Sequence, residues 1–119
     1  MVTPQPSLVY KIATVELAAA AAAAGSFAGM PIDHRDGYIH LSTAAQLSET
    51  LALHFRGQGN LVLLAVRTEA VAEALKWEPS RGGDLFPHLY GPLPMSAVAW
   101  TASIAVGNDG SVALPAGVV

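Results

Sequence analysis

The stretch Leu61-Val62-Leu63-Leu64-Ala65-Val66 decides the fold. A strand with one face in water carries a polar side chain at about every second position, and this run carries none. The run therefore predicts a strand that is buried on both faces. The segments before and after this run predict further strands and helices, which would pack around the buried strand.

The first part of the chain predicts a strand, a helix and a long loop. Residues 8–12 are rich in β-forming residues and predict a strand. Thr14 can cap a helix over residues 15–24, and Gly25 can end it. Residues 25–36 are rich in glycine and polar residues, so we expect a loop there.

A second strand and helix precede the apolar run. Residues 37–42 predict the strand. Thr43 and Gln46 have the spacing of a capping box, in which each side chain bonds the free backbone N–H of the other residue. We expect the helix that they open to end near Gly57.

The segments after the apolar run predict mainly strands. A short helix capped by Thr68 and running through Leu75 comes first, followed by a loop over residues 79–87. Residues 97–106 alternate weakly and predict a strand. A turn at 108–110 then leads to a final short strand over 111–114.

This order of elements predicts an α+β fold. Strands and helices alternate at first, and only strands follow, so we expect a mixed, split β-sheet with about three helices. The composition does not change along the chain, which predicts a single domain over residues 8–115. Residues 1–7 hold two prolines and no periodicity, and they predict a loose N-terminal segment.

Composition excludes several classes of function. The 119 residues include six Lys and Arg against nine Asp and Glu, a net charge of −3, so we expect no general nucleic-acid binder. The absence of Cys excludes disulfides, thiolate metal sites and cysteine nucleophiles.

The longest apolar run, residues 17–24, is far shorter than the ~20 residues that span a bilayer. Glu16 beside that run, and no basic residue in positions 1–10, argue against a secretion signal. We therefore expect a cytoplasmic protein without a membrane partner, as a monomer or homodimer.

The strand over residues 37–42 carries the first candidate site. Its alternation places Tyr38, His40 and Ser42 on one face. An imidazole, a hydroxyl and a ring in one row suit the wall of a ligand cleft. The alternative is a sheet face covered by a loop, with His40 merely hydrogen-bonded.

A second cluster contains His88 and Tyr90, two residues apart. If this segment is extended, both side chains point the same way and could hold a flat polar ligand such as a nucleotide. The alternative is that Tyr90 packs and His88 caps a backbone carbonyl.

Glu78 and Arg81 are candidates between these clusters. Beside the ring of Trp77, the carboxyl of Glu78 could have a raised pKa or could stabilise a developing cation. Arg81 precedes Gly82-Gly83 and could grip a phosphate with help from backbone amides. The alternatives are a solvated carboxylate and a flexible turn.

Two other basic residues are weaker candidates for the site, and several known motifs are missing. Arg35 is a weaker candidate for binding a phosphate, and we expect His54 to be structural. HExxH, GxSxG and GxGxxG are all absent from the sequence. We therefore expect no metal, no hydrolase elbow at Ser42 and no NAD site of the Rossmann type.

Three stretches together resemble a known bacterial family. They are Asp36-Gly37-Tyr38-Ile39-His40-Leu41-Ser42-Thr43 with Gln46 and Thr50, then Leu61-Val62-Leu63-Leu64, then Trp77-Glu78-Pro79 through Phe86-Pro87-His88-Leu89-Tyr90-Gly91. The chain resembles the family known as domain of unknown function 952 from about Tyr10 to Trp100.

The family looks like a small relative of the ADP-ribosyltransferase fold, near the RNA 2′-phosphotransferases. The resemblance implies a split sheet that binds NAD in a cleft. It also implies the order of the site residues along the chain. Lys11 would lie on the first strand, where family members often carry His. Tyr38, His40 and Ser42 would follow on a second strand, and Glu78 on a later one.

The resulting site hypothesis has two classes of residue. Glu78 and His40 are the candidate catalytic residues, and the candidate ligand-binding residues are Lys11, Tyr38, Ser42, Arg81, His88 and Tyr90. The ligand would be NAD, ADP-ribose or a related phosphate-bearing molecule. The alternatives are a non-catalytic binding module and an RNA 2′-phosphotransferase-like enzyme.

Overall fold

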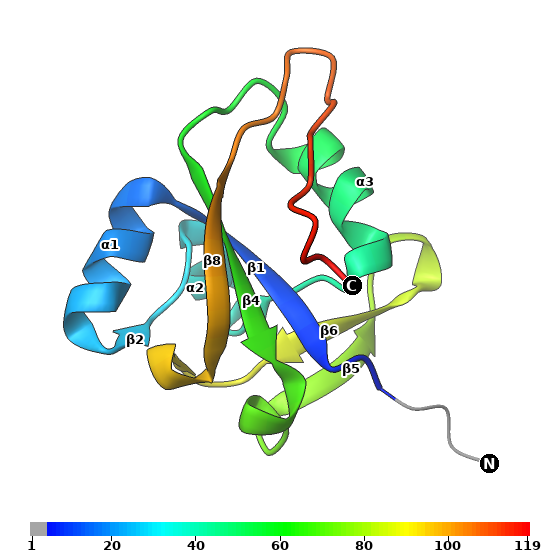
Figure 1. The fold of residues 1–119 in the computed structure, drawn as a ribbon. Coiled ribbons are helices and arrows are strands. Elements are labelled where there is room, and N and C mark those ends of the chain that lie inside the picture. Colours follow the sequence, from blue (N-terminus) through cyan, green and yellow to red (C-terminus); the bar gives the residue numbers. More distant parts are fainter. Residues whose placement is uncertain (1–4) are drawn as a thin grey trace.

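Strand β4 (Leu61–Arg67) lies between β1 (Leu8–Thr14) and β8 (Val98–Ile104) in a three-stranded antiparallel sheet (Figure 1). The structure is a computed structural model that describes residues 5–119. Residues 61 and 63–66 are fully buried, because β4 is the central strand and side chains cover both of its faces. The prediction from the apolar run is confirmed. Of the expected loose segment 1–7, the first four residues lie outside the described part.

A second three-stranded sheet has the order β3-β6-β5. Its strands are β3 (Ile39–His40), β5 (Leu75–Pro79) and β6 (Leu85–Leu89). A two-stranded sheet joins β2 (Ser26–Phe27) to β7 (Leu93–Pro94). One further bridge, between Tyr10 and Ser42, links the first sheet to the end of the β3 segment.

The expected mixed sheet is wrong. Every strand pair in the described residues is antiparallel. The reason is that neither long helix makes a crossover between parallel neighbours. Helix α1 (Val15–Ala24) leads from β1 to a different sheet, and α3 (Ala44–His54) carries the chain from the second sheet back to the first.

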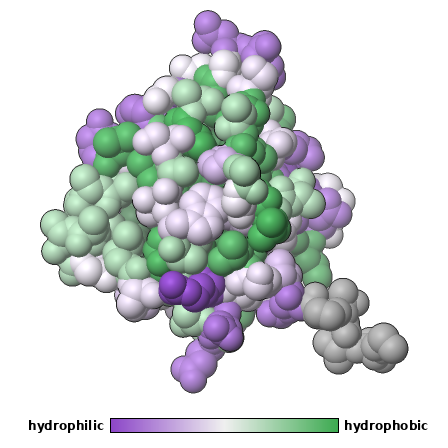
Figure 2. Space-filling view, in the orientation of Figure 1, coloured by the Kyte–Doolittle hydropathy of each residue, from purple (hydrophilic) through white to green (hydrophobic). Residues whose placement is uncertain are grey.

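Both long helices begin where the sequence predicts. The hydroxyl of Thr14 accepts the backbone N–H of Leu17, and Gly25 ends α1 with a φ of 87°. Thr43 and Gln46 form the expected capping box of α3, which ends three residues before the expected Gly57. The outer side of α1 is weakly apolar, since most of its exposed residues are alanine (Figure 2).

The segment expected to be a loop over residues 25–36 contains a helix, α2 (Pro31–Asp36). Pro31 occupies the first helical position, where its missing N–H costs nothing. The Asp33 carboxylate accepts the backbone N–H of Met30 at 2.7 Å, and Gly37 closes the helix with a φ of 86°. These three residues start and stop a helix that is too short to show periodicity.

The later segments differ from expectation in detail. The helix expected over residues 68–75 is only a 3₁₀ turn, η1 (Thr68–Val71), because Leu75 already pairs in β5. The hydroxyl of Thr68 is buried without a partner instead of capping that turn. The expected loop narrows to residues 80–84, which contain η2 (Arg81–Gly83), because β5 and β6 form a hairpin.

The end of the chain follows the predicted turn. Another 3₁₀ turn, η3 (Met95–Ala97), precedes β8. The turn at residues 108–110 is confirmed, but the strand expected over 111–114 is reduced to a single bridge between Val106 and Val112.

The apolar core is divided by the first sheet into two clusters. One cluster joins α1 and the second sheet to one face of β1 and β4, and the other joins α3 and the C-terminal segment to the opposite face. The residues that the structure describes thus form a single α+β domain with three α-helices and several antiparallel sheets. In the described part of the chain, no helix has both the length and the apolar character needed to cross a membrane.

Candidate functional site

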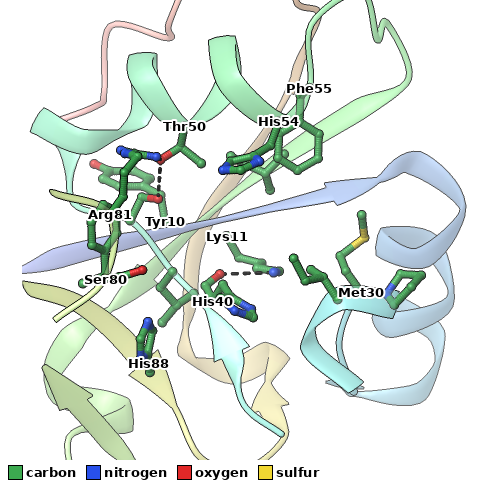
Figure 3. A pocket seen from close by; sticks show the side chains of 16 residues that line it. Tyr10, Lys11, Met30, His40, Thr50, His54, Phe55, Ser80, Arg81 and His88 are labelled. Atoms are coloured by element: carbon green, nitrogen blue, oxygen red, sulfur yellow. Dashed lines mark hydrogen bonds between the residues drawn. The ribbon is translucent and has the colours of Figure 1, made fainter. Parts of the chain in front are cut away.

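A cavity of about 390 Å³ lies between the first sheet and the second (Figure 3). Its walls come from β1, from the β3 and β6 strands, and from helices α2 and α3. Thr50 and His54 of α3 lie on one side of it, opposite His40 and His88. The polar residues of the lining are Lys11, His40, Ser42, Thr50, His54, Ser80, Arg81 and His88.

Lys11 and Asp33 form a buried ion pair at the cavity wall. The Lys11 Nζ lies 2.7 Å from Asp33 Oδ2, and the two side chains are 5% and 1% exposed. Burial opposes the charge on Asp33. The hydrogen bond from His40 and the charge of Lys11 outweigh it and lower the pKa of Asp33 to about 2. Burial also lowers the pKa of Lys11, although Asp33 favours its ammonium form. Lys11 uses two of its three N–H donors, on Asp33 and on the backbone carbonyl of His40 at 3.1 Å.

His40 is held between two carboxylates. Its Nδ1 lies 2.6 Å from Asp33 Oδ1, and its Nε2 lies 2.9 Å from Asp36 Oδ2. A hydrogen bond from the Arg35 guanidinium, more than any other contact, lowers the pKa of Asp36. Both ring nitrogens of His40 are thus bonded to carboxylate oxygens, which fix the plane and position of the imidazole at the cavity wall.

His88 lies directly across the β3–β6 pairing from His40, with ring centroids 5.7 Å apart. Its Nδ1 donates to Glu78 Oε1 at 2.9 Å, and the hydroxyl of Tyr90 donates to the same oxygen at 2.6 Å. These two bonds, the one from Tyr90 first, lower the pKa of Glu78. The raised pKa considered from the sequence is therefore wrong. The same bond raises the pKa of Tyr90 to about 12.

Tyr38 packs against both imidazoles. Its ring centroid lies 4.6 Å from that of His40 and 4.1 Å from that of His88, and it stacks on Tyr90 at 5.2 Å. Burial, followed by the nearby Asp36 and Glu78, raises the pKa of Tyr38. The two tyrosines therefore support the imidazoles and lie outside the cavity lining.

Arg81 reaches the cavity from the loop between β5 and β6. Its Nη1 donates to the hydroxyl of Thr50 at 3.3 Å, and its Nε lies 3.3 Å from Glu49 Oε1. Its guanidinium also stacks 4.9 Å above the ring of Phe86. Ser42 donates to the same Thr50 hydroxyl over a longer distance, 3.4 Å. These contacts place a cation and two hydroxyls on one side of the cavity.

The structure brings together five of the eight residues named from the sequence. The five that line the cavity are Lys11, His40, Ser42, Arg81 and His88. The other three, Tyr38, Glu78 and Tyr90, contact the imidazoles from outside the lining. Arg35 lies away from the cavity, with its side chain 70% exposed.

Sequence reasoning missed three residues of this region. Asp33 and Asp36 hold His40, and His54, expected to be structural, lines the cavity. A signal for Asp33 was present, since a Pro at the first helical position followed by an acidic residue is typical of a helix start. No comparable signal marked His54, whose place depends on how α3 packs.

The lining of the cavity contains basic side chains but no acidic ones. None of its lining residues in the described part of the chain is Asp or Glu, whereas Lys11 and Arg81 are among them. The carboxylates that pair with these cations lie outside the lining. The cationic groups therefore line the cavity directly, and their carboxylate partners lie behind or beside them, 2.7 Å away for Lys11 and 3.3 Å away for Arg81.

Comparison with known proteins finds one family and several solved structures that resemble this chain. Residues 12–101 match the family described as protein of unknown function DUF952. The chain is similar to protein CC0527 from Caulobacter crescentus, a structural genomics target. Its crystal structure has 51% identity and a TM-score of 0.84, over 89% of this chain and 93% of that chain. Its solution NMR structure has 51% identity and a TM-score of 0.78, over 90% and 91%. No curated protein matches the chain.

Proposed function

The chain belongs to the DUF952 family, whose function is not established, and from its geometry we propose that the cavity binds a small phosphate-bearing molecule. The observation that carries this proposal is the lining itself, in which Lys11, His40 and Arg81 face the cavity and no carboxylate does. A volume of about 390 Å³ lies within the range of small-molecule pockets, about 300–1,000 Å³.

Each lining group has a role in this proposal. Lys11 keeps one N–H donor free of protein partners, and Arg81 keeps part of its fork of donors, so both can bind phosphate oxygens. His40, held by Asp33 and Asp36, adds a fixed imidazole beside them. Ser42 and His88 bind hydroxyl groups of the ligand. Glu78 acts through His88 as a positioning residue.

NAD and ADP-ribose are the ligands that we propose first. Both carry two phosphates between ring systems, and the cavity combines its cations with apolar walls from Ile12, Phe55 and Phe86. Residues from β1 and from the β3 segment meet at the cavity, which agrees with the resemblance to the ADP-ribosyltransferase fold. That fold assignment remains part of the proposal.

Two other functions use the same cavity. A non-catalytic binding module would hold the ligand without turnover. An RNA 2′-phosphotransferase would bind a longer polyanion, and the chain carries only six Lys and Arg for that task. The cavity lies between the two sheets and has a volume of about 390 Å³, which favours a small molecule over RNA.

Isothermal titration calorimetry with ADP-ribose, NAD and a 2′-phosphorylated oligonucleotide tests the proposal. We expect heat with ADP-ribose or NAD at up to millimolar concentration, with affinity that falls as salt rises. Arg81→Ala should weaken binding about tenfold or more, because a charge-assisted hydrogen bond contributes roughly 1.5–3 kcal/mol.

Arg67→Ala is the matched control, since it removes an equal charge from an exposed residue outside the lining. Equal affinity in this variant and in the wild type, with loss in Arg81→Ala, would support the cavity as the binding site. No heat with either small molecule would remove the proposal, and tight binding of the oligonucleotide alone would favour the phosphotransferase.

A further inference from the structure

The two facing imidazoles differ in their hydrogen bonds. His40 has both ring nitrogens occupied by carboxylates. His88 has one occupied nitrogen, Nδ1, and no protein group in the described residues bonds its Nε2. Its ring points from β6 into the cavity (Figure 3), although the residue is only 3% exposed.

Glu78 decides which nitrogen of His88 carries the proton. An ionised carboxylate at Nδ1 accepts a hydrogen bond, so the proton of the neutral ring stays on Nδ1. The lone pair of Nε2 then faces the cavity. Glu78 is itself held by the hydroxyl of Tyr90 at 2.6 Å, which keeps the carboxylate in place. This arrangement is that of a base and its orienting carboxylate.

The charges of the cavity indicate the kind of reaction that such a base would serve. Lys11 and Arg81 stabilise negative charge, so the favoured transition state is anionic. The imidazole nearest to the base, that of His40, has both ring nitrogens bonded to Asp33 and Asp36 and so offers no proton to a leaving group. This favours a leaving group that departs as a stable anion, as a phosphate does and an alkoxide does not.

We propose that the protein hydrolyses the phosphoanhydride bond of a dinucleotide or nucleoside diphosphate derivative, with His88 as the general base. This inference rests on the proposed function, because it requires the phosphate-bearing ligand to bind in the cavity. His88 is the catalytic residue, and Glu78 is a positioning residue.

The step balances with water as the co-reactant. The Nε2 of His88 takes one proton from a water molecule, whose oxygen forms a bond to phosphorus. The P–O bond of the anhydride breaks, and its electron pair leaves with the second phosphate as an anion. Lys11 and Arg81 neutralise the phosphate oxygens, and His88 then releases its proton to solvent. With NAD the products are AMP and nicotinamide mononucleotide.

The products formed from NAD distinguish hydrolysis of the anhydride from release of free nicotinamide at the same site. We expect the wild-type protein, in buffer with EDTA, to release AMP and nicotinamide mononucleotide, separated by chromatography. His88→Gln should lower kcat by about 100-fold or more, the usual effect of losing a general base, while calorimetry still shows NAD binding. His34→Gln, an exposed histidine outside the lining, is the matched control and should keep full activity.

A spectroscopic readout tests the role of Glu78 without any substrate. In a long-range ¹H–¹⁵N spectrum at neutral pH, His88 should carry its proton on Nδ1 and none on Nε2. Glu78→Leu should give a mixture of the two neutral tautomers of His88, with the proton on Nδ1 or on Nε2. It should also lower kcat more than it changes KM. A proton on Nε2 of His88 in the wild type would overturn the inference.

The outcomes separate this inference from the proposed function. Release of free nicotinamide, or binding of NAD without turnover, would overturn hydrolysis of the anhydride and leave ligand binding intact. Failure of NAD and ADP-ribose to bind at all would overturn both.

Discussion

Asp33→Asn should be the most informative substitution for the stability of this fold. Asp33 accepts four hydrogen bonds, from Lys11, His40 and two backbone N–H groups, and its side chain is only 1% exposed. Removal of its charge leaves the buried ammonium of Lys11 without a counter-ion. Breaking one partner of a buried pair costs about 3–5 kcal/mol, so we expect a loss of roughly 3 kcal/mol in the free energy of unfolding at pH 7.

The pKa of Asp33 adds a pH window to this prediction. Its value of about 2 lies below the ordinary 3.8, so the folded state favours the ionised carboxylate. The corresponding stability, about 2 kcal/mol, is present above pH 4 and is lost as the pH falls through about 2. The difference between wild type and Asp33→Asn should therefore shrink by about 2 kcal/mol between pH 5 and pH 2.

Urea unfolding, followed by the fluorescence of Trp77 and Trp100 at several pH values, measures both effects. Asp84→Asn is the control, because it removes an exposed carboxylate that bonds none of these groups. The reasoning is refuted if Asp33→Asn costs under 1 kcal/mol at pH 7. It is equally refuted if its pH dependence matches that of the wild type.

Three further predictions follow from other parts of the fold. Leu63→Ala in the fully buried central strand should cost about 2–5 kcal/mol in urea unfolding, whereas Leu53→Ala, at a residue that is 56% exposed, should change stability by under about 0.5 kcal/mol. Thr14→Ala should cost about 1 kcal/mol through the lost cap of α1, and Thr14→Ser should restore most of it; equal stability of both variants would contradict the cap. In an ultraviolet pH titration, one tyrosine should ionise only at a pH of about 12, and Tyr90→Phe should lose that step, since the Glu78 carboxylate raises the pKa of Tyr90.

The elements that could be predicted from the sequence are those whose signals are local. The unbroken apolar run of β4 and the caps at Thr14 and Thr43 depend on neighbouring residues only, and all three were confirmed. The direction in which strands pair is not local. An order of strands along the chain leaves parallel and antiparallel pairing open, and the expectation of a mixed sheet failed for that reason.

The candidate site shows the same division. Strand alternation predicted that His40 and Ser42 share a face, and both line the cavity. The pairing of His40 with His88 depends on the register of two distant strands, which no local pattern encodes. Asp33 lies in a six-residue helix that contacts β1 and β3, and only the start of this helix, at Pro31 and Asp33, could be read from the sequence, because the helix is too short to show periodicity.

The binding of α2 to two strands has a consequence for how a ligand enters. Asp33 ties this helix to Lys11 of β1, and both Asp33 and Asp36 tie it to His40 of β3, so protein groups alone hold this wall in place. The wall is therefore assembled in advance, and a ligand gives up little of its binding energy to order the protein. Association should accordingly be a single fast phase whose observed rate rises linearly with ligand concentration, without a slow closing step.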